Sequence, residues 1–131
     1  MTSLPIELEM LLWSAILYFV QIMLPAAAVD IKEGAAFGIS NRETAPTNSV
    51  WVDRAERAYR NMAENLLPFA CLVMIAVSSG NTGETSAMGA TVFFFSRLAY
   101  AVLYPAGITP FRSLAWFGGL IGMGMIIYQI L

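Results

Sequence analysis

A dense group of polar side chains lies between Arg54 and Asn65. Within these twelve residues are three arginines, two glutamates and two amides, and an apolar segment, residues 66–77, follows directly. Polar groups that enter hydrocarbon are costly, so a cluster of them there indicates a functional site. Arginine binds carboxylates and phosphates through paired hydrogen bonds, and a glutamate can accept an ammonium group. The cluster therefore predicts a site for a small charged molecule.

Helical spacing divides this cluster into faces. Arg57, Asn61 and Glu64 share one face, with Arg60 close by, and we expect this face to point into the protein. The same residues also suit a network of salt bridges and hydrogen bonds that locks helices together, so a purely structural role is an open alternative.

A second polar face is predicted further along the chain. Arg97, Tyr100 and Tyr104 follow one another at i, i+3 and i+7, and Arg112 comes shortly after them. Arg97 lies inside an otherwise uncharged stretch, where it could contact a ligand or pair with Glu64. Together the two faces offer several guanidinium groups, a carboxylate, an amide and two phenols.

This set of groups suits a ligand with two carboxylates and one ammonium, which is the polar layout of glutathione. An arginine beside the sulfur lowers the pKa of the glutathione thiol, and the thiolate is the reactive nucleophile. Tyrosine phenols can donate hydrogen bonds to a thiolate or to a developing oxyanion. The predicted chemistry is therefore thiolate attack on an electrophile.

The elements that position these residues are membrane-spanning helices. The chain is 58% hydrophobic and 12% charged, against about 45–50% and about 25% in soluble domains. A helical span needs roughly 20 apolar residues. The sequence predicts one all-α domain over residues 1–131, an integral-membrane four-helix bundle with spans at about Pro5–Val29, Asn61–Ser79, Ala87–Tyr104 and Pro110–Leu131.

The short connection between the second and third spans makes them antiparallel neighbours. Glu64 and Tyr100 are equally distant in sequence from Thr82, in the middle of that connection, so they should lie at similar depth. Arg112 and Lys32 should lie at the same end of the bundle. The sequence therefore predicts one polar pocket built from several helices.

Charge and composition restrict the remaining possibilities. Basic residues lie in or beside the first and third connections, which places these in the cytoplasm and both termini in the periplasm of a bacterial inner membrane. The net charge of -2 argues against a nucleic-acid partner. With no histidine and a single cysteine, the chain contains no metal-binding motif.

The polar motifs resemble those of a known membrane family. Arg54-x-x-Arg57-x-x-Arg60-Asn61-x-x-Glu64, followed by Pro68-Phe69, is similar to the signature of the membrane-associated proteins in eicosanoid and glutathione metabolism (MAPEG). Arg97-x-x-Tyr100-x-x-x-Tyr104 with Arg112 resembles the matching segment of the leukotriene and prostaglandin E synthases in that family. The resemblance covers all four predicted spans.

The resemblance implies a homotrimer that holds glutathione between subunits near the cytoplasmic face and acts on a lipophilic substrate from the bilayer. Arg112 and Tyr104 would be the catalytic residues: Arg112 would stabilise the thiolate, and Tyr104 would line the pocket beside it. The remaining implied binding residues are Lys32, Arg57, Arg60, Asn61, Glu64, Arg97 and Tyr100. The expected activity is that of a glutathione-dependent transferase or peroxidase.

Two other function classes remain open. One is a catalytically silent MAPEG-fold protein that serves as a structural or lipid-binding subunit of a membrane assembly. The other is a small four-span multidrug transporter, which needs a glutamate embedded in the first span. Glu7 and Glu9 lie at the very start of that span, which disfavours the transporter.

Overall fold

A computed structural model describes residues 3–33, 50–108 and 110–131 of the chain. The described residues form four long helices: α1 (Ile6–Glu33), α3 (Val50–Ser78), α4 (Glu84–Ala106) and α5 (Phe111–Ile130). Each is long and apolar enough to cross a membrane. The predicted four-helix integral-membrane fold is confirmed.

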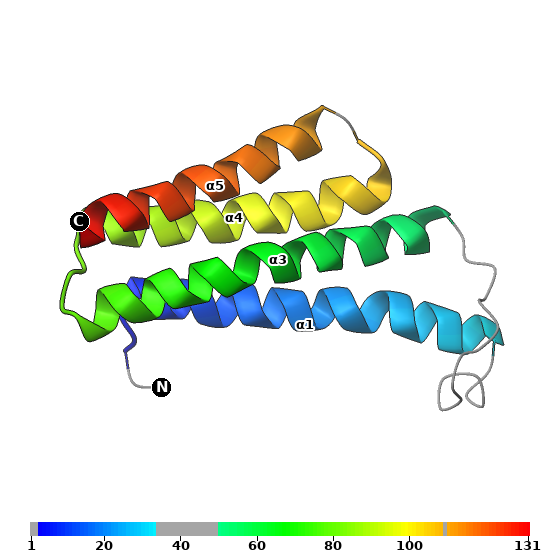
Figure 1. Ribbon diagram of the computed structural model, residues 1–131. Coiled ribbons are helices and arrows are strands. Elements are labelled where there is room, and N and C mark those ends of the chain that lie inside the picture. The colour runs from blue at the N-terminus through cyan, green and yellow to red at the C-terminus, as the bar shows by residue number, and fades with distance from the viewer. Residues whose placement is uncertain (1–2, 34–49, 109) are drawn as a thin grey trace.

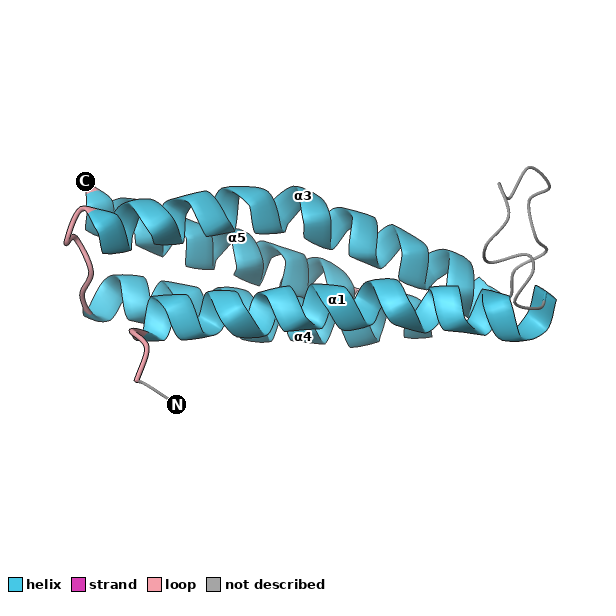
Figure 2. Ribbon diagram, turned by 90° about the horizontal axis from the view of Figure 1, so that it is seen from below, coloured by secondary structure: helices cyan, strands magenta, loops and turns pink. Residues whose placement is uncertain are grey.

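The helices run up and down in chain order. Figure 1 shows both termini and the α3–α4 connection at one end of the bundle, with the α4–α5 connection at the other end. α1 packs against α3 and α4, as seen from below in Figure 2, whereas α5 packs mainly against α4 and also contacts α3. The α4–α5 connection, which Arg112 follows, thus lies at the same end as the start of α3.

α3 begins at Val50, well before the predicted span begins at Asn61. Val52, Ala55, Ala58 and Met62 recur at helical spacing, and all four are buried. This apolar stripe holds the polar segment in helical form, because its burial against the neighbouring helices stabilises the added turns. The polar cluster therefore lies within one continuous helix, whose start lies at the end of the bundle with the α4–α5 connection.

Glycines allow α4 and α5 to approach closely. A Cβ added to Gly122 would lie 2.5 Å from the carbonyl oxygen of Gly89 and 2.8 Å from the backbone nitrogen of Phe93. Small residues permit such backbone contact in membrane bundles, where dispersion forces and close packing hold helices together. A Cβ added to Gly118 would meet the Ser96 side chain of α4, so Gly118 and Gly122 both pack against α4 within one chain.

An acidic residue of α1 holds the starts of α1 and α4 together, at the end of the bundle away from the α4–α5 connection. Glu7 is only 4% exposed and hydrogen-bonds the hydroxyl of Ser86, in the first turn of α4. The Ser86 hydroxyl in turn accepts a hydrogen bond of 2.9 Å from the N–H of Gly83, the N-cap of α4. A carboxylate at a helix N-terminus is stabilised by the helix dipole, so Glu7 ties the start of α1 to the start of α4.

Candidate functional site

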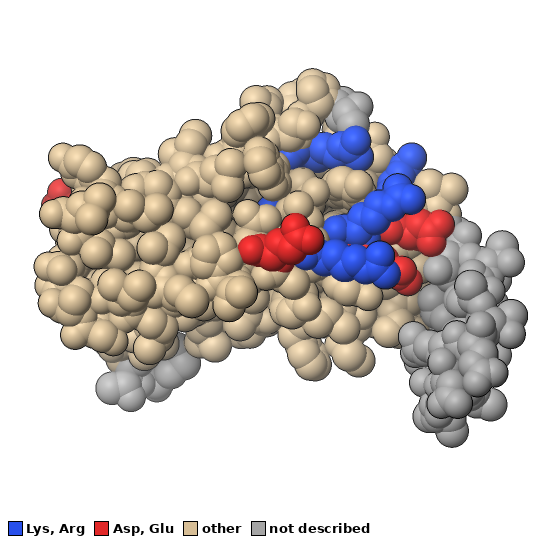
Figure 3. All heavy atoms as spheres, viewed as in Figure 1, with Lys and Arg blue, Asp and Glu red and all other residues tan. Residues whose placement is uncertain are grey.

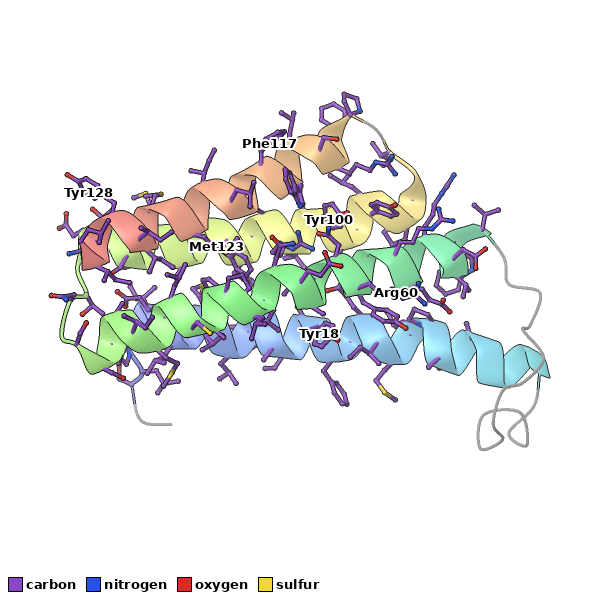
Figure 4. The ribbon with its side chains drawn as sticks, viewed as in Figure 1. Tyr18, Arg60, Tyr100, Phe117, Met123 and Tyr128 are labelled. Carbon is purple, nitrogen blue, oxygen red and sulfur yellow. The ribbon has the colours of Figure 1, made fainter. Side chains whose placement is uncertain are left out.

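A polar groove opens between α3, α4 and α5 in the half of the bundle nearest the α4–α5 connection. Its volume is about 400 Å³, and it is lined by Asn61, Tyr100, Tyr104, Arg112, Ser113, Trp116 and Phe117. Four of these were predicted site residues, from three different helices. Figure 4 labels two lining residues, Tyr100 on α4 and Phe117 on α5.

Two arginines and two tyrosines form a continuous series along the groove. The guanidinium carbon of Arg97 lies 4.4 Å from the centre of the Tyr100 ring. The Tyr100 and Tyr104 ring centres are 5.3 Å apart, and the guanidinium carbon of Arg112 lies 4.6 Å from the Tyr104 ring centre. A guanidinium over an aromatic ring is attracted by the ring quadrupole, so each tyrosine positions an arginine. The series places two fixed positive charges beside one groove.

The chain turns sharply to bring Arg112 to Tyr104. Gly107, the C-cap of α4, adopts a left-handed conformation with φ of 73°, and its N–H bonds the carbonyls of Leu103 and Tyr104. Glycine adopts this conformation without the steric cost a side chain would add. The guanidinium of Arg54, from α3, lies directly against Gly107 outside the groove lining.

Arg97 is the most unusual group beside the groove. The residue is 1% exposed, and none of its three guanidinium nitrogens has a hydrogen-bond partner in the described part of the chain. The pair with Glu64 considered from the sequence is therefore not formed. A buried cation without a hydrogen-bond acceptor is unfavourable, and among the described residues Arg97 has only the face of the Tyr100 ring beside it, so an anionic ligand would stabilise it.

Asn61 enters the groove with its amide already oriented. The amide nitrogen of Asn65 donates hydrogen bonds to the Asn61 backbone carbonyl at 2.8 Å and to the Asn61 side-chain oxygen at 3.2 Å. Because the side-chain oxygen is engaged, the amide nitrogen of Asn61 is the atom best placed to donate to a ligand.

The inward direction predicted for the whole α3 face is wrong for the single chain. Arg57 and Glu64 are exposed, and only Asn61 is half-buried. Arg60 is exposed too, and its guanidinium lies 3.8 Å from the carboxylate of Glu56. Asn61 and Glu64 are three residues apart, so their side chains point in similar but not identical directions. A small rotation of α3 about its axis is enough to leave Asn61 half-buried and Glu64 exposed.

The charged side chains gather toward one end of the visible surface. In Figure 3, basic and acidic side chains gather over the half of the visible face nearest the α4–α5 connection, and the other half is almost entirely uncharged. Arg60, labelled in Figure 4, lies on α3 in that charged half. Lys32, the remaining predicted binding residue, has a side chain outside the described part of the structure.

Three groove residues were not predicted from the sequence: Ser113, Trp116 and Phe117. Trp116 follows Arg112 by four positions and Phe117 follows Ser113 by four, so each pair lies on one side of α5. The i, i+4 spacing from Arg112, a predicted site residue, is the signal that could have identified Trp116.

The fold and the groove define an integral-membrane four-helix protein with a basic, aromatic-lined site near one end of the bundle. The sequence model of the MAPEG family matches residues 10–131. The chain therefore belongs to the MAPEG family, whose members are often glutathione-dependent transferases or peroxidases. A comparison with curated proteins found no match.

Proposed function

We propose that this protein is a membrane-embedded, glutathione-dependent transferase or peroxidase that acts on lipophilic electrophiles. The observation that supports this most directly is the series Arg97–Tyr100–Tyr104–Arg112 beside the polar groove. It places two cations and two phenols beside one hollow in an otherwise apolar bundle, where electrostatic interactions are stronger than in water.

The groove suits glutathione in size and in charge. Its volume of about 400 Å³ falls within the range of about 300–1,000 Å³ usual for small-molecule sites. The unpartnered guanidinium of Arg97 requires an acceptor, which a carboxylate supplies. Asn61 lines the groove and its amide nitrogen adds a donor there, whereas Arg97 lies beside the groove against Tyr100. The residues present therefore fit a molecule with more than one anionic group.

Each residue has a distinct task in this proposal. Glutathione, when bound, supplies a nucleophilic thiolate. Arg112, near the start of α5, stabilises the negative charge of that thiolate. The contact of its guanidinium with the Tyr104 ring restricts its motion. The Tyr104 phenol donates a hydrogen bond to that charge. Arg97 and Asn61 hold the polar backbone of the ligand, with Tyr100 between them.

The exposed charges of α3 support a trimer in which a second copy completes the site. Arg57 and Glu64 are exposed although they belong to a helix that crosses the membrane. Charged groups facing lipid are costly, so a neighbouring subunit that covers this face removes the cost. We include Arg57, Arg60 and Glu64 as ligand contacts on this basis, and Lys32 because the family resemblance implies it. Because basic residues lie in or beside the first and third connections, the groove faces the cytoplasm in this proposal and both termini lie in the periplasm.

Glutathione binding to the detergent-purified protein tests the proposal. We expect saturable binding by isothermal titration calorimetry and an ultraviolet absorbance increase from the bound thiolate. Arg112→Gln should abolish the absorbance change and weaken binding by about tenfold or more, because a charge-assisted hydrogen bond contributes about 1.5–3 kcal/mol.

Arg54→Gln is the matched control, since it removes the same charge from a residue that lies against Gly107 outside the groove lining. It should bind glutathione like the wild type. No saturable binding to the wild type, or equal loss in both variants, would refute the glutathione site.

The second candidate function is that of a structural or lipid-binding subunit. The exposure of Arg57 and Glu64 favours it as well, because a different membrane protein could cover the same face. Purification in a mild detergent distinguishes the two. A stoichiometric second polypeptide, together with absence of glutathione binding, favours the subunit, whereas a homotrimer that binds glutathione favours the enzyme.

A further inference from the structure

A second hollow lies between α1, α3 and α4. This apolar cavity has a volume of about 250 Å³ and is lined by Gln21, Leu24, Pro25, Trp51, Ala55, Ala58, Ala101, Val102 and Pro105. It shares no lining residue with the polar groove, and α5 contributes nothing to it. Figure 1 shows α1 and α5 on opposite sides of the α3–α4 pair, so the two hollows are separate.

Gln21 supplies an unsatisfied acceptor in this otherwise apolar lining. Its side-chain oxygen is buried and has no hydrogen-bond partner within the described residues. A buried amide oxygen without a donor costs about 1–3 kcal/mol. A buried polar group in a membrane helix is usually satisfied by a partner, so this oxygen is a candidate acceptor for a ligand donor.

The two prolines of the cavity add further acceptors. Pro25 lies inside α1 and Pro105 inside α4. Proline has no N–H, so each removes the helical hydrogen bond to the carbonyl four residues earlier. The backbone carbonyls of Gln21 in α1 and Ala101 in α4 therefore lack their usual helical N–H donor, and both residues belong to the cavity lining.

We propose that this cavity binds an uncharged lipophilic molecule with one hydroxyl donor, taken from the bilayer. The apolar walls favour a hydrocarbon body, and the buried Gln21 side-chain oxygen favours a hydrogen-bond donor on the ligand. None of the described residues that line the cavity is charged, so among them an anionic or cationic ligand would lack a partner. The site is independent of the proposed glutathione chemistry.

Tryptophan fluorescence provides a direct readout. The chain has three tryptophans, and Trp51 is the one that lines the cavity. In a Trp13→Phe/Trp116→Phe background reconstituted in nanodiscs, a medium-chain ω-bromoalcohol should quench Trp51 saturably. The bromoalkane of equal length, which lacks the donor, should bind about fivefold more weakly after correction for membrane partitioning, as expected for one neutral hydrogen bond.

Two further variants separate the cavity from the surrounding lipid. Gln21→Met keeps the side-chain length but removes the acceptor, so it should weaken the alcohol about fivefold and leave the alkane unchanged. Ala101→Leu fills the cavity and should abolish saturable quenching by both probes.

Several results would overturn the proposal. One is quenching that rises linearly with probe content, which indicates lipid collision alone. Another is equal binding of alcohol and alkane, and a third is unchanged quenching in Ala101→Leu. If Gln21→Met does not yield folded protein by size-exclusion chromatography, the probe comparison in the reporter background and Ala101→Leu decide the question.

Discussion

The guanidinium carbon of Arg112 lies 4.6 Å from the centre of the Tyr104 ring, and the two residues come from different helices. Tyr104 is near the end of α4 and Arg112 is near the start of α5, so the turn between them sets this contact. Arginine keeps its charge under all ordinary conditions. The tyrosine thus holds a permanent cation in one place at the rim of the groove.

The ring and the phenol of Tyr104 should contribute differently. Tyr104→Phe keeps the stacking surface for Arg112 but removes the hydroxyl. We expect the glutathione dissociation constant to change by no more than about twofold, whereas kcat/KM should fall about a hundredfold, as when one donor to developing negative charge is lost. Tyr104→Leu, which removes ring and hydroxyl, should weaken binding as well. Full activity of Tyr104→Phe would contradict a role for the phenol.

Arg97 should destabilise the unliganded protein. Arg97→Met replaces a buried, unpartnered guanidinium by an apolar side chain of similar length. We expect the thermal midpoint in detergent to rise, with a gain of about 1–4 kcal/mol, the range found when buried charges are replaced by apolar groups. The same variant should lose most of the stabilisation that glutathione gives the wild type.

The control for Arg97 is Arg60→Met, which removes an exposed guanidinium paired with Glu56. Exposed pairs contribute about 0–1 kcal/mol, so its thermal midpoint without ligand should stay close to that of the wild type. A clear fall in the midpoint of unliganded Arg97→Met would show that Arg97 has a partner within the folded protein.

Glu7 should stabilise the bundle far more than its neighbour Glu9. Glu7→Ala removes the buried acceptor for the Ser86 hydroxyl at the start of α4. Hydrogen bonds to charged groups contribute about 1.5–3 kcal/mol, and the helix dipole adds to this. We expect a lower thermal midpoint for Glu7→Ala than for Glu9→Ala, measured in the same detergent. Equal midpoints would indicate that the Glu7–Ser86 contact contributes nothing.

The sequence was sufficient for the fold because lipid imposes strong rules on helices. Uncharged stretches of the required length predicted four spans, and the structure has four such helices in the expected up-and-down order. Spacing also placed Arg97, Tyr100 and Tyr104 on a common side of α4, as the ring contacts show. The binding roles of these residues stay predictions.

The outward face of α3 could not be predicted in the same way. Apolar residues occur both in the core and on the lipid-facing surface of a membrane helix, so periodicity does not separate inside from outside. Phe69 is fully buried and stacks on Phe93, whereas the neighbouring Leu67 is exposed. The direction of Glu64 depends on this tertiary packing, which the local pattern does not record.

The α4–α5 contact allows the sharpest stability test, because two glycines of α5 lie only two residues apart in very different surroundings. Gly122→Ala places a methyl group 2.5 Å from the Gly89 carbonyl oxygen, so backbone must shift. We expect a loss of about 1–3 kcal/mol, as for other overpacked cores. Gly124→Ala meets no atom within 4 Å, and should gain about 0.5–1 kcal/mol from the higher helix propensity of alanine. A Gly122→Ala midpoint equal to or above that of the wild type would show that the two helices do not approach at Gly122.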